Sequence, residues 1–599
     1  MAIAVDLKSF EVPRNLEEAH VLALQLYLNL KLWLFSTYYP GTYTTETTYE
    51  SIAWGLARLL RDVFVVYLAF VQLAKFYRYV RGYGVLECIR QIYNRVSSSI
   101  SSTVMSLPPI KAKIDKELAS TIVKMEQEII KNDDGLLQFP NLPAEGIAKG
   151  DVSQELDKLK TLKHSDWVNG RVSGAVYHGG DELLQLQVEA YDKYSVANQL
   201  HPDVFPGVRK MEAEVVHMVL DIFNAPPTGC GATTSGGTES LLLTGLAARE
   251  YGRKYKGITE PEVIAPVTIH AGIEKACFYF GMKLHKVELD PVTYQVDTKK
   301  VEKLINSNTV LLCGSAPNYP HGIIDDFQTL SDLAVKYKIP LHVDACLGSF
   351  IVSFLERSKV HKDRKLPKFD FRLPGVTSIS CDTHKYGFAP KGSSIIMYRD
   401  PKLRECQYYI SSDWTGGMYG SPTLAGSRPG ALVVGCWATL INIGKEGYTK
   451  FCYDIVLSAM KLRRAIEENP TLSKYLEIIG DPIGSVIAFR IRPAQEDNLS
   501  IYEISDLLSK KGWHFSTLQN PPALHFALTR LTVPVIDELI DDLEGCTKDA
   551  VRISEEHKNG GIKKKQGDTA ALYGIAGSVH TAGLADRLIS AYLDALYKI

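Results

Sequence analysis

Lys385 lies in the segment with the clearest chemical pattern in this chain. It belongs to Ser380–Gly387 (SCDTHKYG), which follows the apolar segment TSIS and precedes the loop FAPKGSS. A lysine at the end of a sheet strand, among small and polar residues, can condense with a carbonyl cofactor and then act as both tether and proton carrier. Most lone lysines are surface residues, so this hypothesis requires partner residues elsewhere in the chain.

The first partner is a candidate phosphate cradle. Ser235–Ser240 (SGGTES) precedes the helical sequence LLLTGLAAREY, so its backbone N–H groups are expected at a helix N-terminus, where a phosphate is favoured. The same sequence is also typical of an ordinary turn with an N-cap, and the P-loop pattern GxxxxGK[ST] is absent. Gly236, Gly237 and Thr238 are therefore candidates whose role depends on the rest of the site.

Asp344 and His270 are the other partners. Asp344 ends the predicted strand IPLHVDA, where a carboxylate can pair with a pyridinium nitrogen. His270 ends the predicted strand VIAPVTIH, where an imidazole can lie flat on a pyridine ring. Each also has an ordinary interpretation, the Asp as a cap and the His as a turn residue. Because open α/β sheets bind ligands at the carboxyl ends of their strands, one shared site explains all of these residues together.

The elements expected to position this site alternate along the chain. From about Trp167 to Gly444, helical patterns separate short apolar strands, which predicts a mostly parallel sheet with crossover helices. The predicted strands are 263–269, 309–316, 339–345, 377–382 and 393–398. Further strand-like segments, 485–491 and 523–531, fit a smaller C-terminal α+β domain. The predicted fold class is α/β, with a large domain over 167–444 and a small one over 445–599.

Residues 1–96 are predicted to carry a membrane helix. Val63–Ala74 (VFVVYLAFVQLA) is almost wholly apolar but is flanked by charged residues. Because a bilayer crossing needs about 20 apolar residues, the predicted span is extended to about 55–79, with a buried or interfacial helix as the alternative. The Ser-rich stretch 97–108 is interpreted as a linker, and 97–166 as this linker with a helical arm.

The bulk composition narrows the class of protein. A chain of 599 residues with 45% hydrophobic and 23% charged residues is an ordinary globular protein with more than one domain. A formal net charge of −1 with dispersed Lys and Arg gives no reason to expect a nucleic-acid partner. Ten cysteines without a CxxC pair or zinc-ligand spacing predict no disulfide scaffold and no metal site, and favour a reducing compartment.

Two short motifs carry a resemblance to a known family. The strand-ending His342–Ala345 (HVDA) and the pair His384-Lys385 resemble the fold-type I pyridoxal-phosphate enzymes of the group II decarboxylase family. Within this group, the chain from about Trp167 to Tyr597 is similar to the sphingosine-1-phosphate lyases, the fungal ones in particular. The similar segments include SGAVYHGG (173–180), ANQLHPDVFPGVRKME (197–212), CGATTSGGTES (230–240), ISCDTHKYGFAPKGSS (379–394) and YGSPTLAGSRPG (419–430).

This resemblance implies a complete site. Pyridoxal 5'-phosphate is expected on Lys385, with its ring near His270, Asp344 and His384. Its phosphate is expected on Gly236, Gly237 and Thr238, and Ser427 is expected to reach it from a second subunit. The resemblance assigns the substrate phosphate to Tyr177, Asn198, His201 and Lys391.

The implied reaction is a retro-aldol cleavage. The C2–C3 bond of a phosphorylated sphingoid base breaks, giving a long-chain aldehyde and phosphoethanolamine. The general base stays open between His384, a tyrosine and the phosphate of the cofactor. The resemblance also implies a homodimer held in the endoplasmic reticulum membrane by a single span, with the catalytic domain in the cytosol.

Two other functions are weighed against the lyase. An amino-acid decarboxylase of the same fold would keep Lys385, Asp344 and His270 but would need an arginine for the substrate carboxylate. A non-catalytic membrane scaffold would have no reason to keep Lys385 together with a phosphate cradle and a ring partner.

Overall fold

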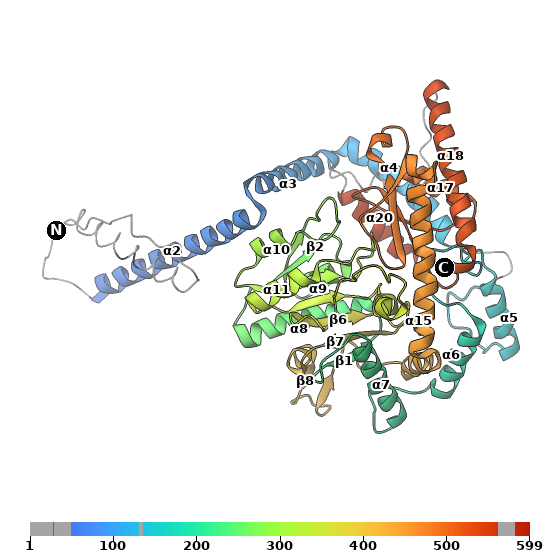
Figure 1. Ribbon diagram of the computed structural model, residues 1–599. Helices are drawn as coiled ribbons and strands as arrows, with labels where there is room; N and C mark the ends of the chain where they lie inside the picture. The colour runs from blue at the N-terminus through green and yellow to red at the C-terminus, as the bar shows by residue number, and fades with distance from the viewer. Residues whose placement is uncertain (1–24, 26–27, 29–48, 131–135, 561–581) are drawn as a thin grey trace. The chain divides into compact units, whose positions relative to one another are not determined.

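The structure is a computed structural model that describes residues 25, 28, 49–130, 136–560 and 582–599 (Figure 1). The chain divides into two compact units, Met1–Gln91 and Ile92–Ile599. All candidate site residues belong to the second unit, so the fold of that unit decides how they meet.

A seven-stranded sheet forms the centre of the second unit. Its strands are β1 (Cys230–Thr234), β2 (Glu262–Pro266), β3 (Lys283–Val287), β4 (Thr309–Ser315), β5 (Leu341–Asp344), β6 (Val376–Cys381) and β7 (Ser394–Tyr398). They lie in the order β1-β7-β6-β5-β4-β2-β3. Only β7 runs against its neighbours in this sheet, since all pairs from β6 to β3 are parallel. The predicted mostly parallel α/β sheet is confirmed.

Helices cover this sheet because its strands are apolar throughout. Every residue of β4 is buried, as expected for a strand covered on both faces. Leu241 and Leu242 of α8 (Gly237–Lys256) belong to one core cluster with Val263 of β2 and Leu311 of β4. The other helices between the strands are α9 (Ala271–Tyr279), α10 (Thr298–Leu304), α11 (Phe327–Tyr337) and the short α12 (Ser349–Val352) and α13 (Leu355–Ser358). They complete the crossovers that the alternating pattern predicts.

The predicted strands correspond to observed ones, with one error that concerns the site. β2 ends at Pro266, so His270 does not end a strand as predicted. It is the N-cap of α9, and its Nδ1 atom accepts a hydrogen bond from the Gly272 N–H at 3.0 Å. A histidine ring can cap a helix in this way, and the segment Val267–Ile269 turns to reach that position.

The C-terminal part contains a second, antiparallel sheet in the order β10-β11-β13-β12. Its strands are β10 (Leu476–Ile478), β11 (Val486–Ile491), β12 (Ser516–Leu518) and β13 (Ala523–Ala527). Helices α17 (Ile501–Lys510) and α18 (Ile536–Gly560) accompany them, which gives the predicted smaller α+β arrangement. The long helix α15 (Gly430–Glu468) leads into this region and is broken at Gly444, where φ is 62°.

The remaining helices of the second unit precede the sheet or end the chain. They are α4 (Pro108–Ile129), α5 (Lys149–Lys160), α6 (Asp181–Tyr194), α7 (Pro206–Ile222) and α20 (Ala582–Ala595), while the short α14 (Pro401–Arg404) follows β7 and the short α16 (Leu472–Tyr475) precedes β10. The division into domains at 96, 166 and 444 stays a prediction.

The N-terminal helix α2 (Tyr49–Tyr83) contains an apolar segment, Leu60–Tyr83, of 24 residues with mean hydropathy 1.4. By length and composition this segment is able to cross a membrane, and it lies slightly further along the chain than the predicted span 55–79. Gly84 separates α2 from α3 (Val85–Met105). The Ser-rich stretch predicted as a linker is therefore wrong as far as Met105, because it forms the end of a helix whose apolar residues recur at helical spacing.

Candidate active site

Lys385 lies in the turn that follows β6. Its Nζ atom is 3.0 Å from Oδ2 of Asp382, and the two side chains are 21% and 3% exposed. Burial by itself would lower the pKa of Lys385, but the charge of the Asp382 carboxylate raises it above the ordinary value. Lys385 is thus a buried ammonium with its own counter-ion.

His384 is held in one orientation beside this pair. Its Nδ1 atom is 2.6 Å from the carbonyl oxygen of Ser393. Because a carbonyl only accepts, Nδ1 carries the hydrogen and Nε2 keeps its lone pair, 3.8 Å from Oδ2 of Asp382. Burial lowers the pKa of His384 against the opposing effect of Asp382, so the ring is neutral near pH 7.

Asp382 is the site residue that sequence reasoning missed. Burial would raise its pKa, but the charge of Lys385 lowers it, so it stays ionised. A Cβ atom on Gly237 would lie 2.8 Å from both of its carboxylate oxygens, so only glycine fits there. The signal in the sequence was its position three residues before Lys385, because residues at this spacing can share a turn. In the structure the Lys385 N–H donates to the Asp382 carbonyl at 3.2 Å and closes this turn.

The predicted phosphate cradle is the N-terminus of α8. Gly236 is the N-cap of this 20-residue helix, and a glycine has no side chain that could accept hydrogen bonds from the first turn. The backbone N–H groups of that turn are therefore available to bind an anion. The carboxylate of Glu239 fixes the preceding loop by accepting from the Ser235 N–H at 2.7 Å. The same carboxylate accepts from the Leu424 N–H at 3.2 Å, which ties the cradle to the loop that carries Ser427.

Asp344 ends β5, as predicted, and is buried. Its Oδ1 atom accepts from the Cys346 N–H at 3.1 Å. In the sheet Asp344 is paired with Ser380 of β6, the strand that leads to Lys385. The ends of β1, β2, β5 and β6 lie at one edge, so the cradle, His270, Asp344 and Lys385 share the carboxyl edge of the sheet.

Tyr177 and Lys391 lie close to the lysine turn. The Lys391 Nζ atom is 4.9 Å from the centroid of the Tyr177 ring, and that ring packs edge-on against Tyr386 at 4.8 Å between centroids. Burial raises the pKa of Tyr177 to about 12. Burial, followed by the charge of Lys385, lowers the pKa of Lys391. Two cations thus share one carboxylate, Asp382, and the excess positive charge suits an anionic ligand.

These contacts define the Lys385 group, which consists of Lys385, His384, Asp382, Tyr177 and Lys391. Two hydrogen bonds tie it to the segment that follows β13. The Tyr386 hydroxyl donates to the carbonyl of Leu528 at 2.8 Å, and the Arg530 N–H donates to the carbonyl of Tyr177 at 3.2 Å.

Three other predicted residues, Asn198, His201 and Ser427, form the Ser427 group. Asn198 Nδ2 donates to Ser427 Oγ at 3.1 Å, and its Oδ1 accepts from the Arg428 N–H at 3.1 Å. The side chains of His201 and Ser427 are exposed. Within the described part of the chain, no hydrogen bond or ion pair joins this group to the Lys385 group, so the predicted substrate-phosphate residues are divided between two places.

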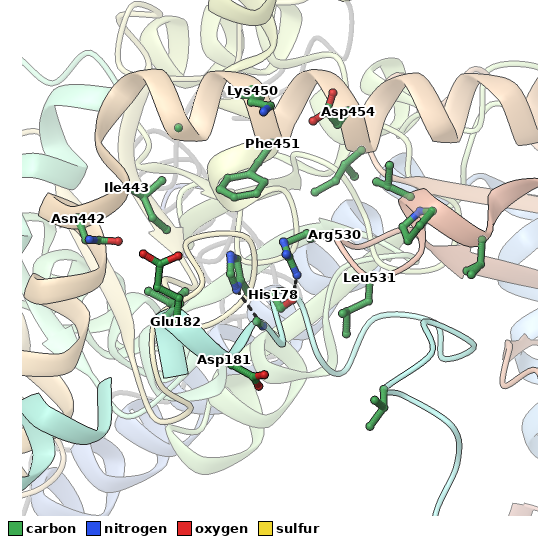
Figure 2. A pocket seen from close by; sticks show the side chains of 18 of the residues that line it. His178, Asp181, Glu182, Asn442, Ile443, Lys450, Phe451, Asp454, Arg530 and Leu531 are labelled. Carbon is green, nitrogen blue, oxygen red and sulfur yellow. Dashed lines mark hydrogen bonds between the residues drawn. The ribbon is translucent and has the colours of Figure 1, made fainter. Parts of the chain in front are cut away.

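A cavity of about 880 Å³ opens next to the Tyr177 segment (Figure 2). Figure 2 shows His178 and Arg530 facing it, with Phe451 of α15 on the opposite side. Burial and then the charge of Arg530 lower the pKa of His178 to about 4, so this imidazole is neutral. The lining contains no member of the Lys385 group, and the cavity is separate from the candidate active site.

Comparison with known proteins identifies the family. Residues 183–492 match the pyridoxal-dependent decarboxylase conserved domain. The sphingosine-1-phosphate lyase of Saccharomyces cerevisiae is 55% identical over 544 residues, which cover 90% of this chain and 89% of that protein. The chain belongs to the sphingosine-1-phosphate lyase family. Sphingosine-1-phosphate lyase 1 of Mus musculus is 35% identical over 99% of this chain and 95% of its own length.

Solved structures agree with this membership. The Burkholderia pseudomallei sphingosine-1-phosphate lyase is 36% identical, with a TM-score of 0.66 over 71% of this chain and 96% of that one. A Lactobacillus brevis glutamate decarboxylase has a TM-score of 0.59 at 20% identity, which shows the shared fold alone. Pyridoxal phosphate is the cofactor of this lyase-family chain.

The residues present fit that cofactor. One carboxylate oxygen of Asp382, Oδ1, is buried and makes no hydrogen bond within the described residues. It lies beside the glycine that opens the phosphate cradle and beside the ammonium of Lys385. A phosphate cradle, a buried lysine and the carboxylate of Asp344 are therefore available at one sheet edge for the phosphate, the carbonyl carbon and the ring of the cofactor.

Proposed function

We propose that this protein cleaves the C2–C3 bond of phosphorylated sphingoid bases by a retro-aldol reaction, releasing a long-chain aldehyde and phosphoethanolamine. The observation that carries this proposal is the Lys385 group. A second cation, Lys391, lies against Tyr177 next to the cofactor lysine, where it is placed to bind a substrate phosphate while Lys385 acts on the reacting amine.

The cofactor supplies an electron sink for the carbon left behind by bond cleavage. Lys385 would hold the cofactor through Nζ. With the cofactor on the substrate amine, the free Lys385 side chain would lie beside Asp382, at the 3.0 Å separation seen in the structure, and would carry the proton that the substrate ammonium gives up. From this position Lys385 would be placed to deliver a proton to C2 of the substrate.

His384 is the candidate general base. Its Nδ1 is committed to the Ser393 carbonyl, so Nε2 is free to accept the proton of the 3-hydroxyl. The Tyr177 phenol, with its pKa raised to about 12, stays protonated and is available to donate a hydrogen bond to the substrate phosphate. Asp344 would pair with the pyridine nitrogen, and His270 would stack on the ring.

The substrate phosphate is bound by Lys391 and Tyr177 from one copy of the chain. The Ser427 group supplies Asn198 and His201 from a second copy, with Ser427 on the cofactor phosphate, so the working enzyme is a homodimer. The exposed side chains of His201 and Ser427 support this assignment, because they lie on the surface of their own chain, where a second copy can reach them.

The enzyme acts at a membrane. The apolar segment Leu60–Tyr83 supports a single span, and the basic Lys75, Arg78 and Arg81 at its carboxyl end support a cytosolic position for the residues that follow. We place it in the endoplasmic reticulum, facing the cytosol, with the lipid bilayer and the phosphorylated sphingoid base as its partners.

The direct test is incubation of the full chain with dihydrosphingosine 1-phosphate, with and without pyridoxal phosphate, followed by assay of aldehyde and phosphoethanolamine. Products that need both the cofactor and Lys385 support the lyase. Carbon dioxide from an amino acid without aldehyde would indicate the decarboxylase. No reaction, with no visible absorbance of bound cofactor, would indicate a non-catalytic membrane scaffold.

A further inference from the structure

Helix α3 (Val85–Met105) has an apolar side that the described residues of its chain leave exposed. Its apolar residues recur every three or four positions, and Leu86, Ile89 and Tyr93 are 84%, 58% and 68% exposed. At about 100° per residue, the exposed apolar side chains fall within an arc of about 120°. This apolar arc consists of Val85, Leu86, Ile89, Ile92, Tyr93, Val96, Ile100 and Val104.

The opposite side of α3 is polar but carries little charge. Its residues include Gln91, Asn94, Ser98 and Ser101. The charged residues of the helix are Glu87, Arg90 and Arg95, and the Arg90 Nη1 atom is 3.5 Å from Oε2 of Glu87. The net charge is therefore small, and the Ser-rich composition that resembles a linker in the sequence is the polar side of an amphipathic helix.

The position of α3 in the chain brings it to the membrane. The apolar segment of α2 ends at Tyr83, and Gly84 alone separates it from α3. Gly84 has a φ of 81°, which ends the first helix and lets the chain change direction. Two Cα–Cα steps span at most about 8 Å, so α3 begins close to the end of α2 and, if α2 spans the bilayer, near the membrane surface.

We infer that α3 is a second membrane-binding element, lying along the bilayer surface with its apolar arc among the acyl chains and its serine-rich side in water. This inference rests on the proposed anchoring by α2. The occupant of the arc is a lipid surface and not a second copy of α3, because the arc starts two residues after the end of the span. Since its charge is small, binding depends on apolar insertion more than on anionic lipids, and loosely packed bilayers are favoured.

The test places a spin label on each side of the helix in the full chain. Val96→Cys reports the apolar arc, and Ser98→Cys, two residues away, is the matched control on the polar side. Both proteins are labelled and reconstituted into dioleoyl phosphatidylcholine vesicles, with labelled wild type as the background for the native cysteines. Collision with oxygen, which concentrates in lipid, is compared with collision with a water-soluble nickel chelate.

The expected result is a reversal between the two sites. The label at position 96 should collide with oxygen several-fold more effectively than with nickel, and the label at 98 should show the opposite preference. Saturated, tightly packed lipid should reduce the preference of the label at position 96 for oxygen over nickel. Anionic lipid should change this preference less than twofold. Equal nickel access at both positions would overturn the inference. So would dipolar broadening between labels at position 96 of two copies, which would show that a second chain covers the arc.

Alkaline carbonate extraction of the same vesicles separates this inference from the proposed anchor. If the chain resists extraction but the label at position 96 is in water, α2 anchors the protein and the inference on α3 is wrong. If carbonate releases the chain, the anchor proposed for α2 is wrong, and the inference on α3 is wrong with it.

Discussion

The Lys385 group and the Ser427 group both belong to the candidate active site, but they differ in how their polar atoms are satisfied. In the Lys385 group, Asp382 neutralises a buried ammonium, and ring contacts enclose Tyr177. In the Ser427 group, Asn198 is bonded to Ser427 and to backbone, and His201 is exposed. The first group is assembled by one chain, while the second presents its remaining polar atoms outward.

This difference separates two kinds of positioning. A buried charge must be matched within the fold, because an unpaired one costs several kcal/mol, about 3–5 when a partner is removed. An exposed serine or histidine needs no such partner and is free to serve a neighbouring subunit. We expect changes in the Lys385 group to alter the chemistry, and changes in the Ser427 group to depend on which chains are combined.

The largest effect is expected for Lys385→Ala. Loss of the residue that holds the cofactor should reduce turnover by at least about a thousandfold. The visible absorbance of bound pyridoxal phosphate should also disappear. Lys391→Ala is the matched control, because it removes a neighbouring ammonium and should keep the absorbance. Normal turnover in Lys385→Ala would show that another residue carries the cofactor.

Asp382→Asn should reduce turnover on the order of a hundredfold, the range of a misplaced proton donor. The carboxylate raises the pKa of Lys385, so its removal lowers that pKa and leaves more neutral amine at a given pH. Cofactor-free Asp382→Asn should therefore bind pyridoxal phosphate with a pH dependence shifted to lower pH. Asp382→Glu, which keeps the charge, should retain the wild-type pH dependence. An unchanged pH dependence in Asp382→Asn would mean that Asp382 only supports the fold.

Lys391→Ala should raise KM about tenfold to a hundredfold with a smaller change in kcat, because it removes a charged hydrogen bond to the substrate phosphate. The pKa of Lys391 is lowered, so its charge is lost at a lower pH than for an ordinary lysine. The wild-type KM should therefore rise under alkaline conditions. Lys391→Arg should keep a flat KM over the same range, and a parallel rise in that variant would assign the titration to another group.

The smallest effect is expected for Asn198→Ala, with a loss of about tenfold. The informative measurement mixes this variant with Lys385→Ala under conditions that exchange subunits. If the Ser427 group completes the site of its neighbour, a hybrid dimer regains one intact site, and an equal mixture recovers about a quarter of wild-type activity. Activity equal to the mean of the two unmixed variants would place the Ser427 group in its own chain's site.

Much of the fold could be predicted because burial leaves a pattern in the sequence. Strands such as β4 and β5 are apolar runs between helices, since both of their faces are covered. β1 (CGATT) and β3 (KLHKV) escaped prediction because they are short and mix small or charged residues into the strand. The linker prediction for the Ser-rich stretch failed because composition outweighed the regular spacing of Ile92, Val96 and Ile100.

The sequence identified most residues of the candidate site but not how all of them are arranged in space. Asp344 could be placed because it ends an apolar strand, and Gly237 because it opens a helix. His270 was placed wrongly, since nothing local distinguishes a strand end from the cap of the next helix. Asp382 was visible in the motif, but its role depends on the approach of Gly237 at the start of α8, which local spacing does not encode.

The hydrogen bonds from Tyr386 to Leu528 and from Arg530 to Tyr177 have a mechanical consequence. One is made by the residue next to the cofactor lysine, and the other by a residue proposed to hold the substrate. Separation of Leu528 and Arg530 from the sheet would break both hydrogen bonds, each with a net contribution of about 1 kcal/mol. Movement of this C-terminal segment is therefore coupled to the turn that holds the cofactor lysine and to the residue proposed to bind the substrate phosphate.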